Sequence, residues 1–165
     1  MTILLPVLKW ALGNSVSMVI PFSRVGGVVR YLQPDDYSCG PTAVLTVLRY
    51  HGDNTKSSKI RKVCKLTEDG AGPKKLIKGL HKLGYDTKYR KVTFGNIKEE
   101  LDQGRPIIVI RNDLAGYEEE GHWSVIARYT DSNLLMADPS LWSRARIPVN
   151  RIRTRLDRRM ICVYP

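Results

Sequence analysis

Cysteine is scarce in this sequence and long apolar runs are absent, and each of these features excludes a class of protein. Only Cys39, Cys64 and Cys162 occur among the 165 residues. An odd number of cysteines without CxxC spacing argues against a disulfide-stapled secreted domain, so we expect a reducing, cytoplasmic compartment. No stretch reaches the roughly 18 uninterrupted apolar residues that a membrane-spanning helix needs. We therefore expect no membrane span.

Histidine is as scarce as cysteine, and its spacing excludes the common metal sites. The three histidines and three cysteines stand apart from one another along the chain, whereas zinc sites draw their ligands from short, repeated spacings. The sequence also lacks a glycine-rich loop of the kind that cradles phosphate. It therefore indicates neither a metal ion nor another cofactor.

The length and composition fit one globular domain with a single core. The chain is 42% hydrophobic and 26% charged, which is usual for a folded protein of this size. Residues 1–20 are apolar, but they lack a basic start and Lys9 interrupts the run, which is atypical of a targeting signal. We expect an N-terminal extension over 1–27 that adds a packed element, followed by one domain over 28–165.

The charge of the chain is strongly positive and unevenly placed. The formal net charge is +11, with twelve Lys/Arg against three acids in residues 56–91 and seven Arg against one acid in 144–159. Such segregation predicts a basic surface that contacts a polyanion, although a merely solvated face explains it equally well. Aromatic residues are not interleaved with the basic ones, which argues against a dedicated nucleic-acid module.

The order of elements predicts an α+β fold with N-terminal helices packed on an antiparallel sheet. We expect a helix that begins at Ser38 or Cys39 and ends before Gly52, with its buried stripe at Ala43, Val44, Leu45 and Leu48. The other expected helices cover 57–66, 72–84 and 95–104, the last capped by Asn96, and the expected strands cover 28–32, 87–94, 105–112, 122–129 and 134–138. The last two strands form a hairpin, which follows an acidic loop over 113–121.

Cys39 is the cysteine with the clearest chemical position. A thiol attacks as its thiolate, and the partial positive charge of a helix N-terminus stabilises that anion. Cys39 stands at such a helix start, and Gly40 keeps bulk away from the sulfur. A buried structural cysteine at a helix start is the alternative. Cys64, inside a predicted helix, fits a small buried apolar group.

A cysteine nucleophile needs a histidine base, and the chain offers three candidates. His51 ends the same helix, about 18 Å from Cys39 at 1.5 Å per residue, so it cannot reach the sulfur. His81 falls inside the helix expected over 72–84, where a surface or hydrogen-bonded histidine is the ordinary interpretation. His122 remains, at the start of a strand behind a glycine.

Asp138, at the end of the partner strand, is the candidate for orienting His122. Side chains alternate across a strand, so the two residues share a face only if the hairpin loop has an odd number of residues, for example 130–132. Asp138 then pairs with Ser124 and lies diagonally within reach of the His122 ring. A four-residue loop would separate the two residues unless a bulge corrects the register.

Gln33 is a candidate donor to the oxyanion of an acyl-transfer reaction. Such a site needs a backbone N–H at the nucleophile and a second donor, and a glutamine amide is suitable. Gln33 precedes Cys39 by six residues, on the connection from strand to helix. An isolated glutamine there would otherwise be an ordinary exposed residue.

Four blocks of the sequence together resemble the peptidase C39 family of bacteriocin-processing, papain-like cysteine peptidases. The Gln and Cys-Gly block reads "QPDDYSCGPTAVLTVLRYHG", the middle segments read "LIKGLHKLGYD" and "GRPIIVI", and the His and Asp-Pro blocks read "GHWSVI" and "ADPS". The resemblance implies a papain-like fold in which Cys39 attacks, His122 is base and then acid, Asp138 orients His122, and Gln33 completes the oxyanion hole.

The resemblance also implies an activity. We expect a cysteine peptidase that cleaves a peptide or precursor protein, of the leader-peptide or double-glycine type, through a thioester acyl-enzyme. Without a membrane span or Walker motif the chain is similar to the free-standing members of the family. Two alternatives stay open: an acyltransferase that uses the same residues, and a catalytically silent binding or structural domain with a basic surface. Gly26-Gly27 resembles a double-glycine cleavage site, which makes self-cleavage after Gly27 a further hypothesis.

Overall fold

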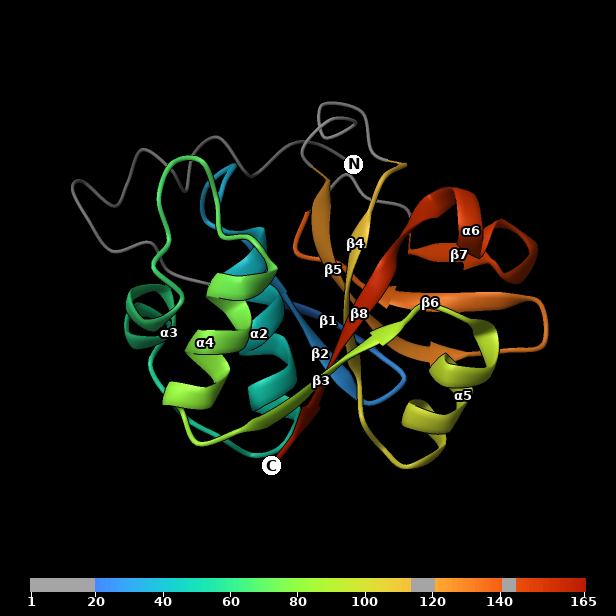
Figure 1. The fold of residues 1–165 in the computed structure, drawn as a ribbon, viewed down its shortest axis with the longest axis horizontal. Coiled ribbons are helices and arrows are strands. Elements are labelled where there is room, and N and C mark those ends of the chain that lie inside the picture. Colours follow the sequence, from blue (N-terminus) through green and yellow to red (C-terminus); the bar gives the residue numbers. More distant parts are fainter. Residues whose placement is uncertain (1–19, 114–120, 141–144) are drawn as a thin grey trace.

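A central antiparallel sheet with helices on both of its faces forms the structure (Figure 1). The computed structural model of the chain describes residues 20–113, 121–140 and 145–165. The packed element expected within residues 1–19 and most of the expected acidic loop, 114–120, lie outside the described residues. Within the described residues, no helix has the length and apolar character that crossing a membrane would require.

The main sheet has six strands in the order β3-β8-β4-β5-β6-β7, and every neighbouring pair is antiparallel. The strands are β3 (Asp86–Lys91), β4 (Ile107–Arg111), β5 (His122–Tyr129), β6 (Asn133–Ala137), β7 (Arg146–Pro148) and β8 (Leu156–Tyr164). The last strand in the sequence, β8, lies between β3 and β4, so the C-terminal segment completes the centre of the sheet. This architecture confirms the predicted α+β class.

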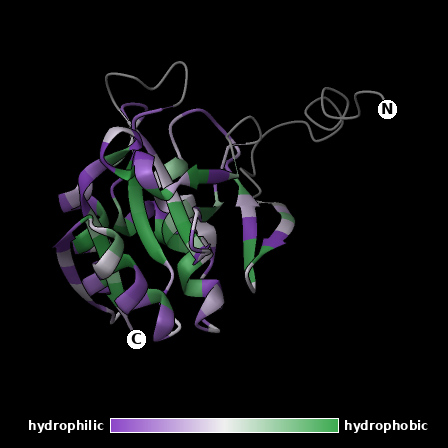
Figure 2. Ribbon diagram, turned by 90° about the vertical axis from the view of Figure 1, so that its right-hand side faces the viewer, coloured by the Kyte–Doolittle hydropathy of each residue, from purple (hydrophilic) through white to green (hydrophobic). Residues whose placement is uncertain are grey.

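Two separate hydrophobic clusters cover the two faces of the sheet. Helices α2 (Cys39–Tyr50), α3 (Ser57–Val63) and α4 (Pro73–Lys82) pack on one face, and α5 (Phe94–Asp102), the 3-10 turn η1 (Val149–Arg151) and α6 (Ile152–Arg155) lie on the other side. Neighbouring residues such as Ile107 and Ile108 belong to different clusters because strand side chains alternate. Figure 2 shows the hydrophobic residues gathered on the inner elements, with hydrophilic residues outside.

Helix α2 is buried all round rather than along one stripe. Every residue of Cys39–Leu48 is buried. The sequence predicted one apolar face, but small and β-branched residues fill the remaining positions, so strand β2 packs against the helix as well as strand β5. A helix enclosed in this way has little freedom to shift. Its first residue, Cys39, is therefore held in place by the core.

The predicted strand over 28–32 is confirmed as β2 (Val28–Leu32), and it pairs with a strand that was not predicted, β1 (Ile20–Val25). Gly26 and Gly27 form the two-residue turn of this hairpin, with φ of +55° and +88°, the left-handed values that such a turn requires. Residues 20–27 thus adjoin the domain expected over 28–165. Cleavage after Gly27 would require this turn to open.

The start of α5 differs from its prediction. The expected cap, Asn96, lies inside the helix, and the cap is Thr93, whose hydroxyl accepts a hydrogen bond from the Asn96 backbone N–H at 3.1 Å. The Asn96 side chain instead donates to the carbonyl of Lys91 at 2.9 Å, where β3 ends. Both residues are good caps, and the extended backbone of Thr93 decides between them.

The crossing of α3 and α4 leaves no room for a side chain at Gly79. A Cβ there would lie 2.7 Å from the Cys64 sulfur and 3.2 Å from its Cα. Gly79→Ala should lower the free energy of unfolding by about 1–3 kcal/mol, as overpacked cores do. Gly95→Ala, in α5 with nothing within 4 Å, should change it by less than about 1 kcal/mol or stabilise. Urea unfolding of the two variants measures these free energies. Equal losses of stability in the two variants would contradict the close packing of α3 and α4 at Gly79.

Candidate active site

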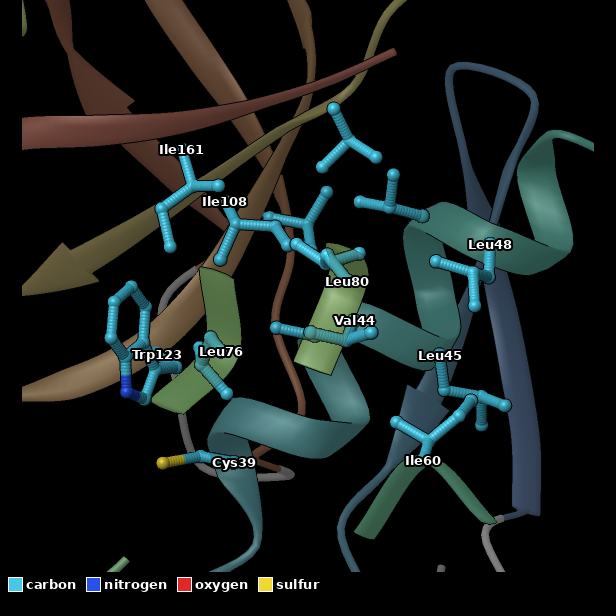
Figure 3. Close-up of a cluster of buried hydrophobic side chains, with 14 of the residues drawn as sticks. Cys39, Val44, Leu45, Leu48, Ile60, Leu76, Leu80, Ile108, Trp123 and Ile161 are labelled. Carbon is cyan, nitrogen blue, oxygen red and sulfur yellow. The ribbon is translucent and has the colours of Figure 1, made fainter. Parts of the chain in front are cut away.

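Cys39 is the first residue of α2 and the most accessible of the three cysteines. Its exposed fraction is 8%, whereas Cys64 and Cys162 are fully buried. Burial raises the pKa of each of those two thiols to about 12, so neither supplies thiolate near neutral pH. In Figure 3, Cys39 lies at the margin of the hydrophobic cluster with its sulfur pointing away from Val44 and Leu45. Cys39 is thus the candidate of the three cysteines for thiol chemistry.

Gly40 gives Trp123 room against the start of α2. A Cβ on Gly40 would lie 3.0 Å from Trp123 Cδ1 and 3.2 Å from Leu76 Cδ2. Trp123 is anchored in turn, since its Nε1–H donates to the carbonyl of Ala71 at 2.8 Å. The sequence explained this glycine by the space around the sulfur. In the structure the glycine lets the helix that carries Cys39 pack against the strand that begins with His122.

His122, the first residue of β5, is fully buried; its Nε2 is hydrogen-bonded to Asp138, and Cys39 lies near enough to influence the charge of its ring. Its Nε2–H donates to Asp138 Oδ1 at 2.7 Å. Because Asp138 holds Nε2, Nδ1 is the candidate ring nitrogen for exchanging a proton with the sulfur. Burial opposes a charge on the ring, but the hydrogen bonds and negative charges of Asp138 and Cys39 outweigh it and raise the pKa of His122 to about 9.

Both carboxylate oxygens of Asp138 are engaged. Oδ1 accepts from His122 and from the backbone N–H of Ser140 at 2.8 Å, and Oδ2 accepts from Arg111 Nη1 at 3.1 Å. Burial opposes ionisation, yet His122 and Arg111 hold the pKa of Asp138 below its usual range. Arg30 also fixes the local backbone, since its Nε–H donates to the Asp138 carbonyl at 2.7 Å. The carboxylate is therefore charged and oriented.

A bulge brings Asp138 to the face of His122. Four residues, 130–133, separate the last paired residues of the β5–β6 hairpin, and such a loop alone would place the two side chains on opposite faces. The register shifts at Ala127, where β5 carries one extra residue. Extending the pairing beyond the bulge sets Ser124 opposite Asp138. The four-residue loop thus occurs together with the bulge that is needed to bring Asp138 to the face of His122.

Gln33 follows β2 and is tied to the loop that carries Asp138. Its backbone N–H donates to the carbonyl of Pro139 at 3.0 Å, and its side-chain Nε2 donates to the carbonyl of Asp35 at 2.7 Å. A glutamine amide has two N–H donors, and the bond to Asp35 uses one of them. The oxyanion role of Gln33 stays a prediction.

The other two histidines lie away from this group. His81 is exposed and its Nε2 lies 2.8 Å from the hydroxyl of Thr87, and His51 caps the far end of α2. The residue that sequence reasoning missed is Arg111, the last residue of β4, which is fully buried and pairs in register with His122. An arginine that ends the apolar run 107–110 is the signal that could have found it, because a buried guanidinium needs an acidic partner.

The pKa of His122 predicts how the site responds to pH. The imidazolium should persist below about pH 9 and be lost above it. In Asp138→Asn the carboxylate that raises the pKa is gone while burial still lowers it, so the midpoint should fall well below about 9. NMR titration of the His122 ring in both proteins measures this. A wild-type midpoint at or below the ordinary value of about 6.5 would contradict the arrangement.

Known proteins resemble this chain in sequence and in fold. The model of the Peptidase C39 family matches residues 28–156. An uncharacterized protein of Methanothermobacter thermautotrophicus is 30% identical over 134 residues, which cover 78% of this chain and 82% of that protein. Another, from Methanothermobacter marburgensis, is 28% identical over 137 residues and covers 82% of each chain.

Solved structures show the same fold. The peptidase domain of Streptococcus ComA, a bi-functional ABC transporter, superposes with a TM-score of 0.69 at 22% identity, covering 81% of this chain and 96% of that one. A double glycine motif protease from an AMS/PCAT transporter, in complex with the leader peptide, gives 0.64 at 17% identity, covering 93% and 96%. By the family match and this shared fold, the chain belongs to the peptidase C39 family.

Proposed function

We propose that this protein is a cysteine peptidase that cleaves a peptide or precursor protein through a thioester intermediate on Cys39. The observation that carries the proposal is the buried chain of contacts from Cys39 through His122 to Asp138. A thiol, an imidazole and a carboxylate follow one another there, and we assign them the roles of nucleophile, base and orienting group in acyl transfer. Membership of the peptidase C39 family supports the same conclusion.

The charges of the site favour an attacking thiolate. His122, with its pKa raised to about 9, carries a proton at neutral pH, and this imidazolium and the N-terminus of α2 both stabilise negative charge on the sulfur. The sulfur attacks the carbonyl carbon of the substrate, and the imidazolium passes its proton to the leaving amine. His122 then takes a proton from water as the water oxygen attacks the thioester carbonyl; the carbon–sulfur bond breaks, the carboxylic acid product leaves, and the thiolate and imidazolium are restored. Because the sulfur must be reduced, we place this activity in a reducing compartment.

Two donors are available for the oxyanion that forms in each half of the reaction. The backbone N–H of Cys39 lies in the first turn of α2, where N–H groups have no acceptor within the helix. The amide of Gln33 is the second, held near Asp138 by its backbone hydrogen bond to Pro139. A pair of this kind is the usual oxyanion hole of acyl-transfer enzymes.

The substrate that we propose is a peptide with a double glycine before the scissile bond. A protease of this fold, at 17% identity, is described as a double glycine motif protease in complex with a leader peptide. Acidic residues in the substrate would suit the lysines exposed on α3, α4 and the segments beside them. These lysines are Lys56, Lys59, Lys62, Lys65, Lys74, Lys78 and Lys82.

Alkylation of Cys39 by iodoacetamide tests the proposal without a known substrate. The wild-type Cys39 should react about tenfold or more faster than an ordinary thiol, because the imidazolium of His122 stabilises negative charge on the attacking sulfur. His122→Ala should abolish the excess, whereas His81→Ala, at an exposed histidine, should retain it. Mass spectrometry of the labelled peptide gives the rate. An ordinary rate that is indifferent to His122 would refute the peptidase.

Product analysis separates the two alternatives that share this site. Peptides with Gly-Gly and with Ala-Ala before the scissile bond, each with an acidic or a neutral flank, are incubated with the enzyme, with and without an added amine. Hydrolysis of the Gly-Gly peptides, with an acidic-flank preference that salt removes, supports the proposal. Products joined to the amine would show an acyltransferase. A reactive Cys39 without any product would favour a binding domain.

Gln33→Ala separates oxyanion stabilisation from activation of the thiol. Loss of one oxyanion donor should lower kcat for the peptide by about 10²–10³. The rate of Cys39 alkylation should stay at the wild-type value, because displacement of iodide forms no tetrahedral oxyanion. A parallel fall of both rates would show that Gln33 only supports the local structure.

A further inference from the structure

A chain of alternating charges extends from Asp138 into the C-terminal segment. Arg111 Nη1 lies 3.1 Å from Asp138 Oδ2, and Arg111 Nε lies 3.0 Å from Asp113 Oδ1. The second oxygen of Asp113 lies 3.0 Å from Nη1 of Arg155, on α6. The side chains of Arg111 and Asp138 are almost completely buried, and only Arg155 is partly exposed, at 31%.

Such an arrangement is a costly way to stabilise a fold. A buried ion pair loses the hydration of both charges, and apolar residues of similar size often stabilise a core as well or better. Arg111 ends a strand whose other residues are Ile107–Ile110, so an apolar residue would suit the position. Packing alone therefore does not explain why a guanidinium occupies position 111.

We propose that Arg111 is a positioning residue for Asp138: its guanidinium fixes the carboxylate and keeps it ionised, so that Asp138 orients and charges His122. This inference rests on the proposed peptidase function. Arg111 and His122 are paired across β4 and β5, so both side chains reach the carboxylate from one side of the sheet. Each takes a different oxygen of Asp138.

The geometry of the guanidinium suits this role. Two of its nitrogens, Nε and Nη2, contact the two oxygens of Asp113 at 3.0 and 3.2 Å, while Nη1 is directed to Asp138. A lysine has one nitrogen and no planar fork, so it cannot hold both acids in this way. Asp113 is itself held by Arg155, whose backbone carbonyl also accepts from the Asn112 N–H at 2.9 Å.

Several charged groups among the described residues face Asp138 and decide its protonation. His122 approaches from β5 and Arg111 from β4, and Arg30 of β2 binds the backbone carbonyl. Cys39 of α2 is the other group that raises the pKa of His122. Burial pushes the pKa of Asp138 upward, and Arg111 is one of the charges that hold it down. Without Arg111, Asp138 takes up a proton at higher pH, and His122 then loses its anionic partner.

A second buried pair provides a matched control for a purely structural role. Glu100 is 1% exposed and lies 2.7 Å from Arg105 Nε, with Arg90 and Tyr164 as its other partners. Within the part of the chain that the structure describes, none of these residues has a side-chain hydrogen bond or ion pair with Cys39, His122 or Asp138. Removing Arg105 therefore breaks a buried ion pair of the same kind without touching the site.

The experiment measures the alkylation rate of Cys39 by iodoacetamide against pH in four proteins: wild type, Arg111→Met, Arg111→Lys and Arg105→Met. Arg111→Met should react roughly ten- to a hundredfold more slowly at neutral pH, and its rate should fall with acid at a higher pH than in the wild type. Arg111→Lys should lie between the two, because the charge remains without the fork. Arg105→Met should keep the wild-type profile even where its unfolding midpoint is lower.

The outcomes separate this inference from the function on which it rests. Alkylation of Cys39 that is fast and depends on His122, but has the same pH profile in the wild type and in Arg111→Met, would overturn the positioning role and leave the peptidase proposal intact. If Arg111→Met does not fold, a wild-type rate and profile in Arg111→Lys would overturn it. An equal change in Arg105→Met would show a general effect of lost stability, which also overturns it. A wild-type Cys39 that reacts like an ordinary thiol would overturn the peptidase itself.

Discussion

The ionised carboxylate of Asp138, held in the interior, is the constraint on which the candidate site depends. A buried charge is costly unless it is paired and hydrogen-bonded, and here His122, Arg111 and a backbone N–H serve its two oxygens. Each of these groups must then be placed by its own strand. The register of β4 with β5 and the bulge in β5 are the features that place them. The raised pKa of His122 follows from the same arrangement.

The two halves of the molecule each supply one part of the site. The candidate nucleophile, Cys39, begins a helix that is buried on all sides, while His122 begins β5 and Asp138 directly follows β6. The contact of Gly40 with Trp123 joins them, because it sets how closely α2 approaches β5. Groups carried on rigid, well-packed elements keep their relative geometry better than groups on loops. The packing of α2 and β5 in the buried core therefore helps to fix the positions of Cys39 and His122 relative to each other.

The C-terminal segment contributes to both the fold and the site. Strand β8 lies between β3 and β4 and completes the centre of the sheet. Just before it, α6 carries Arg155 to Asp113, so the arginine-rich stretch of the sequence joins the buried charges instead of forming only a solvated surface. The exposed lysines of α3 and α4 remain on the outside, where the proposed acidic substrate would meet them.

The sequence by itself predicted the fold class, the helix that starts at Cys39 and the hairpin that carries His122 and Asp138, and it favoured His122 over His51 and His81 as the candidate base. These features follow from periodicity, helix length and the scarcity of histidine, which are local or countable properties. It also stated the parity condition for Asp138, although only the structure showed that the bulge at Ala127 meets it.

Tertiary structure alone decided the remaining features. They are the pairing of β1 with β2, the cap at Thr93, the packing of Trp123 on Gly40 and the ion pairs of Arg111. The physical reason is that these contacts join residues whose local patterns do not refer to one another. An arginine at the end of an apolar strand indicates a buried charge that needs an acidic partner. Only the folded chain shows that one such partner is Asp138, beside His122.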